Sequence, residues 1–369
     1  MIVCLPLLML SVLLQPTGTQ TKSVEEDART ILEKNGAWFK PKSLYSQMIK
    51  NDAEDQQNKA KEVWVSIMGP WTGGKEKLKY LVNISNLTEL LLDHEDLSDD
   101  WCEILDRLPK LKAVFLHEDG VTDRGIAHLA RLKDLEYLSL TSTRLTDKGL
   151  ENLRDKKKLR WLNLDSTKIT DQGLANLKDL KNLEVLLLEE TQTSGEGYAH
   201  LKGLTNLRRL WLSDAMGSRR RKSGLEYFSG LHKLENLGAR GLFVTDDDLV
   251  ALRNMPNLEV LELSFSQITD KGLANLKSLN KLKSLILFDS KITSAGLASL
   301  VKLDNLQGLD VGACEIDDEA IKYFRSMKNL KVLSIEQTFV TEQAVKELQK
   351  ACPNLGINHS AFGTLNARF

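Results

Sequence analysis

The feature that most constrains this chain is a leucine pattern that returns every 24 residues over most of its length. From Leu87 the pattern restarts in 24-residue steps to Leu207, makes one 27-residue step to Leu234, and continues in 24-residue steps to Leu330. Residues 159–182 show the unit, with leucines at unit positions 1, 4 and 6 and again at 16, 19 and 22. The first three have the period of a strand and the last three that of a helix. Each unit is therefore predicted to be one short strand, a turn and one short helix, and only stacked copies bury the apolar side.

This motif resembles the leucine-rich repeat family, in the variant L-x-x-L-x-L-x-x-T-x-I-T-D-x-G-L-x-x-L-x-x-L. Eleven units, numbered here as repeats 1 to 11 from Leu87, cover residues 87–354. A degenerate unit at 63–86 precedes them and keeps Leu78, Leu81 and Ile84 at the helix positions. The resemblance implies a curved α/β solenoid of about 12 repeats, with a parallel sheet on the concave face and short helices on the convex face. It also implies partner binding rather than catalysis.

Composition and motifs narrow the function classes. The 369 residues are 42% hydrophobic, which is ample for one continuous solenoid core in a single domain. Fifty basic and 51 acidic residues give a formal charge of −1, so overall charge does not favour nucleic acid or a membrane surface as the partner. The sequence has no P-loop, nucleophile elbow, zinc-protease motif or paired CxxC. We therefore expect a monomeric binding protein that is not an enzyme and uses no cofactor.

An apolar run at residues 2–14 has the length of a signal-peptide core and is too short to span a bilayer. We therefore predict a signal peptide over residues 1–22, with cleavage in 16–22, and a secreted, cell-envelope or periplasmic protein. Against this prediction, no Lys or Arg precedes Lys22. A short membrane anchor and a cytoplasmic chain stay open as alternatives.

The ends of the solenoid need caps, because a terminal repeat has an apolar face without a neighbour. Residues 23–62 are predicted to form the N-terminal cap. Within it, a helix starts at Ser23 and stops at Asn35-Gly36, and a hairpin joins Trp38-Phe39 to residues 63–65. Repeats then occupy residues 63–354, and residues 355–369 form a less regular C-terminal cap.

Recurring polar residues fit scaffold roles. A Thr-Asp pair at positions 12 and 13, as in Thr146-Asp147, predicts a helix N-cap and a first-turn carboxylate that faces the exposed amides of its own helix. Glycine at position 15, as in Gly149, is predicted to let adjoining coils approach. Threonine or serine at position 9, as in Thr167, is predicted to bond the loop backbone of the adjoining coil.

The cysteines do not form a disulfide framework. Cys102 and Cys314 lie nine repeats apart, which is about 40 Å at the strand spacing of a sheet. Cys314 and Cys352 are predicted on opposite faces of neighbouring coils. Cys4 is removed if the signal peptide is cleaved, so we expect three free and mostly buried thiols. In this the chain is similar to cysteine-poor exported repeat proteins of bacteria, planctomycetes among them.

Partner binding is predicted on the concave face, where positions 3, 5 and 7 point outward between the buried leucines. These 33 positions suffice for a protein or polysaccharide interface. Seven acids against two bases favour a basic partner. Four aromatic residues in repeats 2 to 6 are expected to be exposed anchors, with the alternative that they only cover neighbouring backbone. The candidate residues are Glu89, Asp93, Phe115, Tyr137, Trp161, Asp165, Glu189, Arg209, Trp211, Arg240 and Glu262, followed by Asp310 and Glu336 among the acids.

Two smaller features are weaker candidates. A run of four cations in the 27-residue repeat is predicted to lie on a loop that leaves the coil, where it either contacts an acidic surface or is merely solvated. His94 and His117 occupy nearly equivalent positions in neighbouring repeats and are weak metal-ligand candidates; we predict no metal site. The basic run comprises Arg219, Arg220, Arg221 and Lys222.

Two functions are compatible with these residues. The first is an exported scaffold whose concave face binds a protein or glycan. The second is an intracellular adaptor, because similar T-D-x-G-L repeats occur in F-box substrate receptors of ubiquitin ligases. An F-box requires a helical module before the repeats, and residues 23–62 are short and polar for one. Cellular location separates the two.

Overall fold

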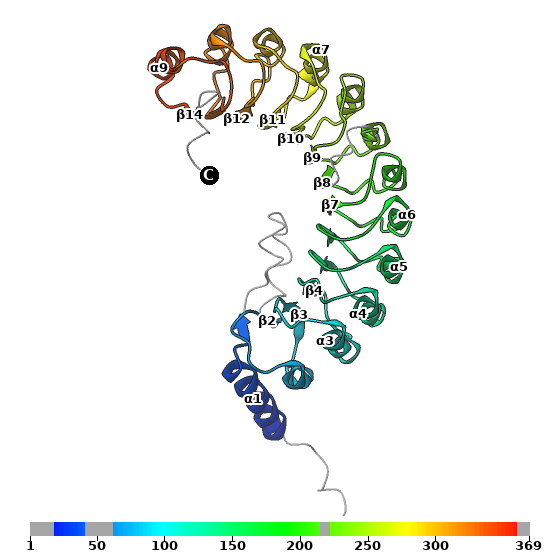
Figure 1. Ribbon diagram of the computed structural model, residues 1–369. Coiled ribbons are helices and arrows are strands. Elements are labelled where there is room, and N and C mark those ends of the chain that lie inside the picture. Colours follow the sequence, from blue (N-terminus) through cyan, green and yellow to red (C-terminus); the bar gives the residue numbers. More distant parts are fainter. Residues whose placement is uncertain (1–17, 41–61, 215–221, 360–369) are drawn as a thin grey trace, which may run out of the picture.

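The structure is a computed structural model that describes residues 18–40, 62–214 and 222–359. Its backbone forms an arc, with the strands along the inner side and the helices along the outer side (Figure 1). One 14-stranded sheet runs the length of the arc, and its strands follow one another in chain order from β1 to β14. This is the curved α/β solenoid that the repeat predicted.

The strands of the sheet are parallel from β2 to β14 and stack with the period of the sequence repeat. Trp161 pairs with Val185, and Arg209 pairs with Asn236, so the sheet absorbs the 27-residue step without a register shift between β8 and β9. The strands are β1 Trp38–Lys40, β2 Val63–Ile67, β3 Leu87–Leu92, β4 Ala113–Leu116, β5 Tyr137–Ser139, β6 Trp161–Asn163, β7 Val185–Thr191, β8 Arg209–Asp214, β9 Asn236–Arg240, β10 Val260–Glu262, β11 Ser284–Ile286, β12 Gly308–Asp310, β13 Val332–Ser334 and β14 Gly356–Asn358.

The convex side consists of short α and 3₁₀ segments, mostly one or two turns long. The α-helices are α1 Gly18–Lys34, α3 Asp99–Cys102, α4 Asp123–Ile126, α5 Asp147–Leu150, α6 Asp171–Leu174, α7 Asp270–Leu273, α8 Ile321–Phe324 and α9 Glu342–Ala351. The 3₁₀ helices are η3 Lys75–Asn83, η4 Glu103–Arg107, η5 Ala127–Arg131, η6 Glu151–Leu153, η7 Gly197–His200, η8 Leu225–Phe228, η9 Asp248–Asn254, η10 Ala274–Ser278, η11 Ser294–Ser299 and η12 Asp318–Ala320. None of the helices in the described ranges is both long and apolar enough to cross a bilayer.

The two ends of the sheet differ from the inner repeats. At the N-terminal end β1 pairs antiparallel with β2, which is the hairpin expected from the sequence, and α1 precedes it. Helix α1 ends at Lys34, next to the predicted stop, but it begins at Gly18, so Ser23 lies inside the helix and is not its N-cap. At the other end β14 adds a regular parallel strand to β13, where we expected a less regular tail. Most of the predicted signal peptide and residues 41–61 lie outside the described residues.

The leucines of the repeat form one continuous core between the sheet and the convex helices. The strand leucines, such as Leu162 and Leu164, and the helix leucines, such as Leu174 and Leu177, are completely buried. Leu78, Leu81 and Ile84 are buried in the same core, which confirms the degenerate first unit.

The aspartate at position 13 joins neighbouring coils, and this differs from the predicted role. Asp147 accepts hydrogen bonds from the backbone N–H of Thr170 (2.7 Å) and from its hydroxyl (2.6 Å), one repeat further along. Thr170 in turn caps its own helix by accepting from the Gln172 N–H. The carboxylate reaches the next coil because position 15 there is glycine: a Cβ on Gly173 would lie 2.2 Å from Asp147 Oδ1. The same Asp-to-Thr/Ser contacts link Asp99 to Thr122, Asp123 to Thr146, Asp171 to Ser194, Asp246 to Thr269, Asp270 to Thr293 and Asp318 to Thr341.

The hydroxyl at position 9 has a more local role than we predicted. Thr143 and Thr167 donate to carbonyl oxygens three residues earlier in their own coil, at 2.8 and 2.6 Å. The accepting carbonyls belong to Leu140 and Leu164, the residues that directly follow β5 and β6. Only in the described pair Ser266 and Ser290 do two position-9 hydroxyls meet across neighbouring coils, at 2.9 Å.

Cys102, Cys314 and Cys352 are free thiols, and the first two are buried, as predicted. Burial raises the pKa of both Cys102 and Cys314 to about 12. Both thiols are therefore protonated and unreactive at neutral pH.

Candidate functional site

The concave surface is a set of rows in which side chains of the same repeat position lie side by side. Because the strands pair in register, a residue at position 5 has the position-5 residues of both adjoining repeats about 4.8 Å away. Glu262, Ile286 and Asp310 are such a row on β10, β11 and β12. The chemistry of the surface therefore changes gradually along the arc, and three parts can be distinguished.

In the N-terminal part, aromatic residues that we expected to be exposed are buried. Phe115, Tyr137 and Trp161 have exposed fractions of 2%, 1% and 7%. They pack into a second apolar cluster with Leu91, Ala113 and Val185, and the Phe115 and Trp161 ring centroids are 6.1 Å apart. Large rings on adjacent strands cover one another at this spacing. These three residues therefore contribute to stability, and the prediction that they are free anchors is wrong.

The acids of this part are also poorly placed for a partner. Glu89 is 1% exposed. Asp93 is half-buried, and one of its carboxylate oxygens lies 3.6 Å from His117 Nδ1. The acidic character of the concave surface therefore depends on the repeats that follow.

The central part gathers half-buried carboxylates on neighbouring strands. Asp165 Oδ1 accepts from the Glu189 N–H at 2.7 Å. Burial raises the pKa of Asp165 to about 6, although this hydrogen bond opposes the shift. Burial, followed by the charges of Asp165 and Glu262, raises the pKa of Glu189, and Arg240 lowers it. Glu189 thus lies close enough to Asp165 and to Glu262 to be repelled by both, and a cation would relieve that repulsion.

The bases and the tryptophan of the central part lie beside these acids. Trp211 is half-buried, and its ring lies over Gly238 of the next strand. A Cβ on Gly238 would be 2.3 Å from Trp211 Cε3. Arg209 is half-buried, and Arg240 is exposed, with its guanidinium 5.3 Å from the ring centroid of Phe265. The predicted residues Asp165, Glu189, Trp211, Arg240 and Glu262 therefore do form one continuous part of the surface.

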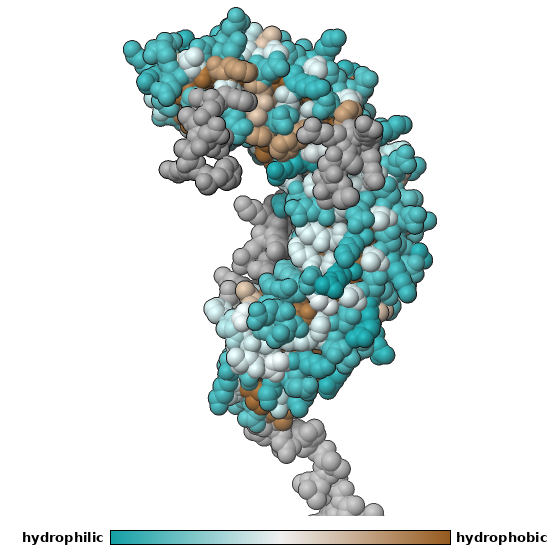
Figure 2. All heavy atoms as spheres, in the orientation of Figure 1, coloured by the Kyte–Doolittle hydropathy of each residue, from teal (hydrophilic) through white to brown (hydrophobic). Residues whose placement is uncertain are grey.

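The C-terminal part carries exposed apolar side chains that the sequence reasoning did not single out. Val332 is 52% exposed and Phe265 is 38% exposed. Val260, Ile286 and Phe288 are half-buried. Hydrophobic surface gathers along the inner side of these coils, around β10 to β12 (Figure 2). The sequence could have predicted this apolar surface from the apolar residues at the outward positions 3, 5 and 7 of consecutive repeats. Phe265 could not have been predicted in this way, because it occupies position 8.

The two histidines of the weak metal hypothesis do not converge. His94 stacks on Trp101, its Nε2 lies 3.2 Å from the Trp71 carbonyl oxygen, and its Nδ1 accepts from the Asp96 N–H. Both ring nitrogens are therefore engaged within the fold. Within the described ranges, no three His, Cys, Asp or Glu side chains are arranged to hold a metal ion.

Asp93, His117 and Ser139 lie at the ends of three adjacent strands, β3, β4 and β5, in the acid–base–hydroxyl order of many hydrolases. His117 Nε2 lies 2.9 Å from Ser139 Oγ, which suits proton transfer. The Asp93 to His117 distance of 3.6 Å is too long for the hydrogen bond that orients a catalytic imidazole. Ser139 is 1% exposed, so a substrate carbonyl has no access to its hydroxyl. The three residues form a structural network.

Of the basic run, Arg219, Arg220 and Arg221 lie outside the described residues, and Lys222 is exposed.

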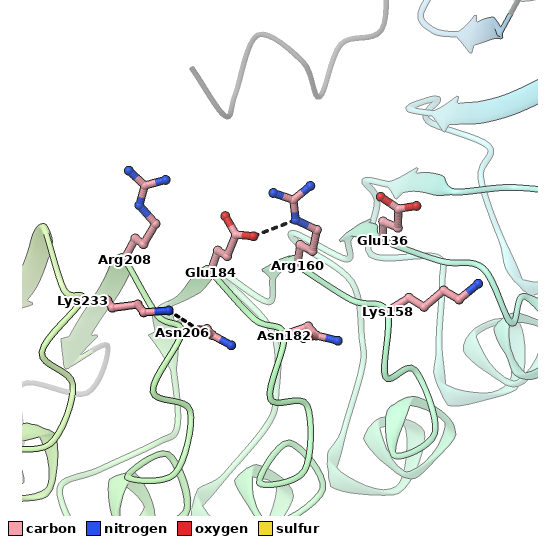
Figure 3. A pocket seen from close by; sticks show the side chains of 8 residues that line it. All are labelled: Glu136, Lys158, Arg160, Asn182, Glu184, Asn206, Arg208 and Lys233. Atoms are coloured by element: carbon pink, nitrogen blue, oxygen red, sulfur yellow. Dashed lines mark hydrogen bonds and ion pairs between the residues drawn. The ribbon is translucent and has the colours of Figure 1, made fainter. Parts of the chain in front are cut away.

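A groove of about 660 Å³ lies along the start of the strands from β5 to β8. Acids and bases alternate along one side of it, where Arg160 Nε lies 2.7 Å from Glu184 Oε1. Beside them, Lys233 Nζ donates to the amide oxygen Asn206 Oδ1 at 2.7 Å (Figure 3). Alternation of this kind lets side chains at the strand spacing attract their neighbours rather than repel them. We assign the groove a structural role. The residues that line it are Glu136, Lys158, Arg160, Asn182, Glu184, Asn206, Arg208 and Lys233.

Comparison with known proteins agrees with this architecture. Residues 249–354 match the family described as Zer-1-like, leucine-rich repeats, and residues 132–153 match the Leucine Rich repeat family. A search of curated proteins finds no significant match. The crystal structure of an internalin (inlF) from Listeria monocytogenes is similar with a TM-score of 0.56 and 21% identity, over 83% of this chain and 92% of the internalin. TLR13, solved as a complex with ssRNA13, is similar with a TM-score of 0.51 and 24% identity, over 75% of this chain but only 40% of the TLR13 chain. The chain is a leucine-rich repeat protein.

Proposed function

We propose that this protein is a non-enzymatic binding scaffold that holds a protein ligand on the concave face of its solenoid. The observation that carries the proposal is the composition of the central and C-terminal concave surface. There, half-buried carboxylates that repel one another adjoin exposed aromatic and aliphatic side chains. Such a mixture has no role in stacking the repeats, and it is typical of surfaces that become buried in a complex.

The absence of catalysis is part of the proposal. The acid–base–hydroxyl arrangement found among the described residues does not have the geometry of a catalytic triad, and this supports the proposal. Ser139 is inaccessible, and Asp93 is too distant from His117. A polysaccharide is a less favoured ligand, because the apolar residues of this surface include the aliphatic Val260, Ile286 and Val332, which offer no ring face for a sugar.

Affinity capture with the full chain in the cells that produce it tests the concave site. We expect wild-type protein to retain a partner that the double variant Trp211→Ala/Arg240→Ala loses. The control Lys277→Ala/Lys302→Ala removes two exposed lysines of the convex side and should retain it. Equal retention by both variants would place the binding site elsewhere.

We further propose that the protein is exported, on the strength of the apolar run at residues 2–14. Cell fractionation with N-terminal sequencing tests this. A mature chain starting within residues 17–23 in the envelope or the medium supports export. An intact Met1 in the cytosol refutes it and favours the intracellular adaptor.

A further inference from the structure

The apolar residues of the C-terminal concave surface are interleaved with carboxylates. Ile286 on β11 pairs in register with Glu262 on β10 and with Asp310 on β12, so one aliphatic side chain lies between two acids in the position-5 row. All three are half-buried. A ligand that covers Ile286 therefore also meets a carboxylate on either side.

An aromatic pair borders this row. The Phe265 and Phe288 ring centroids are 5.6 Å apart in an edge-to-face arrangement. The Phe288 ring packs closely over Gly312 of the next coil, as shown by the 2.8 Å that would separate a Cβ on Gly312 from Phe288 Cδ2. Phe265 has φ 61°, a left-handed conformation that bulky residues rarely adopt. The other non-glycine residues with this conformation in the described repeats are small or polar: Asn86, Ser142, Ser166, Glu190, Asp289, Ala313 and Gln337.

The charges around this surface select the kind of partner. Glu262 and Asp310 flank Ile286, and Glu189, three repeats before Glu262, lies within reach of the charges of both Glu262 and Asp165. Arg240 is a cation within reach of Glu189, and its guanidinium lies over Phe265. An anionic ligand such as a nucleic acid meets net repulsion here, whereas cations gain both charge pairs and aromatic contacts.

We propose that the surface formed by Val260, Glu262, Phe265, Ile286, Phe288 and Asp310 docks a protein segment in which Arg or Lys side chains alternate with aliphatic or aromatic ones. This inference rests on the proposed scaffold function. It places the binding site in the C-terminal half of the arc and limits the ligand to one class of protein segment. The apolar side chains of the segment cover Ile286 and the phenylalanines, and its cations pair with the flanking carboxylates.

Selection from a phage-displayed library of random 12-residue peptides on the immobilised full chain tests the partner chemistry. We expect recovered peptides to be enriched in Arg and Lys together with Leu, Ile, Phe or Trp. Their dissociation constants should rise with salt concentration, because exposed charge pairs are screened. Recovery of acidic or uncharged peptides, or of no binding peptide, overturns the inference.

Variants locate the site with one synthetic peptide from that selection. Glu262→Gln/Asp310→Asn keeps the side-chain shapes and should weaken binding about fivefold or more, and Phe265→Ser about tenfold. Circular dichroism verifies that both variants fold. The control Glu226→Gln/Asp304→Asn removes the same charges from exposed positions off the concave sheet and should bind as wild type.

The outcomes separate the two proposals. If the C-terminal variants bind normally but Trp211→Ala does not, the docking inference fails and the concave scaffold stands. If none of these concave variants changes peptide binding, both proposals fail.

Discussion

At the scale of single residues, the departures from the repeat are more informative than the repeat itself. Lys156 occupies position 22 of its repeat, where the neighbouring repeats carry Leu132 and Leu180. It is 1% exposed, and its Nζ donates to the carbonyl oxygens of Leu129, Ala130 and Leu132. The ammonium thus caps the end of η5 from the adjoining coil, at the cost of burying a charge.

Replacing Lys156 with leucine is expected to raise stability at neutral pH. Burial lowers the pKa of Lys156 to about 8 from its usual 10.5, so the unfolded chain holds this proton more tightly. The folded wild type is therefore penalised below pH 8 and gains stability as the pH rises from 8 to 10.5. Denaturant unfolding of wild type and Lys156→Leu across this range checks the prediction. Their difference in unfolding free energy should shrink as the pH rises, and a difference independent of pH would contradict it.

Asp165 is expected to destabilise the free protein at neutral pH. Its pKa is raised from 3.8 to about 6, so the folded state binds the proton more tightly and loses stability as the pH rises through this window. Asp165→Asn should raise the free energy of unfolding by ~1–3 kcal/mol at pH 7.5, at 1.36 kcal/mol per pKa unit, and should change it little at pH 3.5. Thermal unfolding at the two pH values measures the difference. A loss of stability at pH 7.5 would mean that the carboxylate stabilises the fold.

At the scale of elements, the contacts between Asp at position 13 and Thr or Ser at position 12 of the next repeat hold adjoining coils together. These contacts are interrupted in the irregular middle of the chain. Position 13 is Gly195 in repeat 5, and its equivalent in repeat 6, three residues before Leu225, is Lys222, so no carboxylate is available there. Thr245, in the next repeat, instead donates its backbone N–H and its hydroxyl to Asp248 of its own turn.

Breaking one of these contacts should cost stability locally. Asp147→Ala leaves the Thr170 N–H and hydroxyl without their acceptor, and should lower the free energy of unfolding by about 1–3 kcal/mol. Asp179→Ala removes an exposed carboxylate from the convex side and serves as the matched control. Equal effects of the two variants in urea unfolding would show that the contact contributes nothing.

The glycine of this contact should be equally intolerant of change. A Cβ on Gly173 would clash with the Asp147 carboxylate at 2.2 Å, whereas nothing lies within 4 Å of a Cβ on Gly230. Gly173→Ala should therefore lower the free energy of unfolding by roughly 1–3 kcal/mol, and Gly230→Ala should leave it nearly unchanged. Thermal unfolding of both variants measures this, and a tolerated Gly173→Ala would mean that the coils can move apart at little cost.

At the scale of the whole molecule, the 24-residue period was sufficient to predict the solenoid, because leucines at strand and helix spacing can only be buried by stacking. The concave surface was harder to predict, since exposure depends on neighbours in other repeats. Phe115, Tyr137 and Trp161 were chosen singly as aromatic residues; their burial follows from the apolar residues beside them at the same outward positions. Phe265 was missed because its exposure depends on a left-handed backbone at a position that the strand pattern does not cover.

Site-specific photo-crosslinking in the producing cells tests most directly whether the concave face binds the partner. A photoreactive phenylalanine analogue replaces Ile286, on the concave β11, in one variant of the full chain. In another it replaces Lys277, on the convex η10. A discrete adduct with a protein partner from the Ile286 position alone is the expected result. An adduct from Lys277 alone, or the same adduct from both positions, would contradict it.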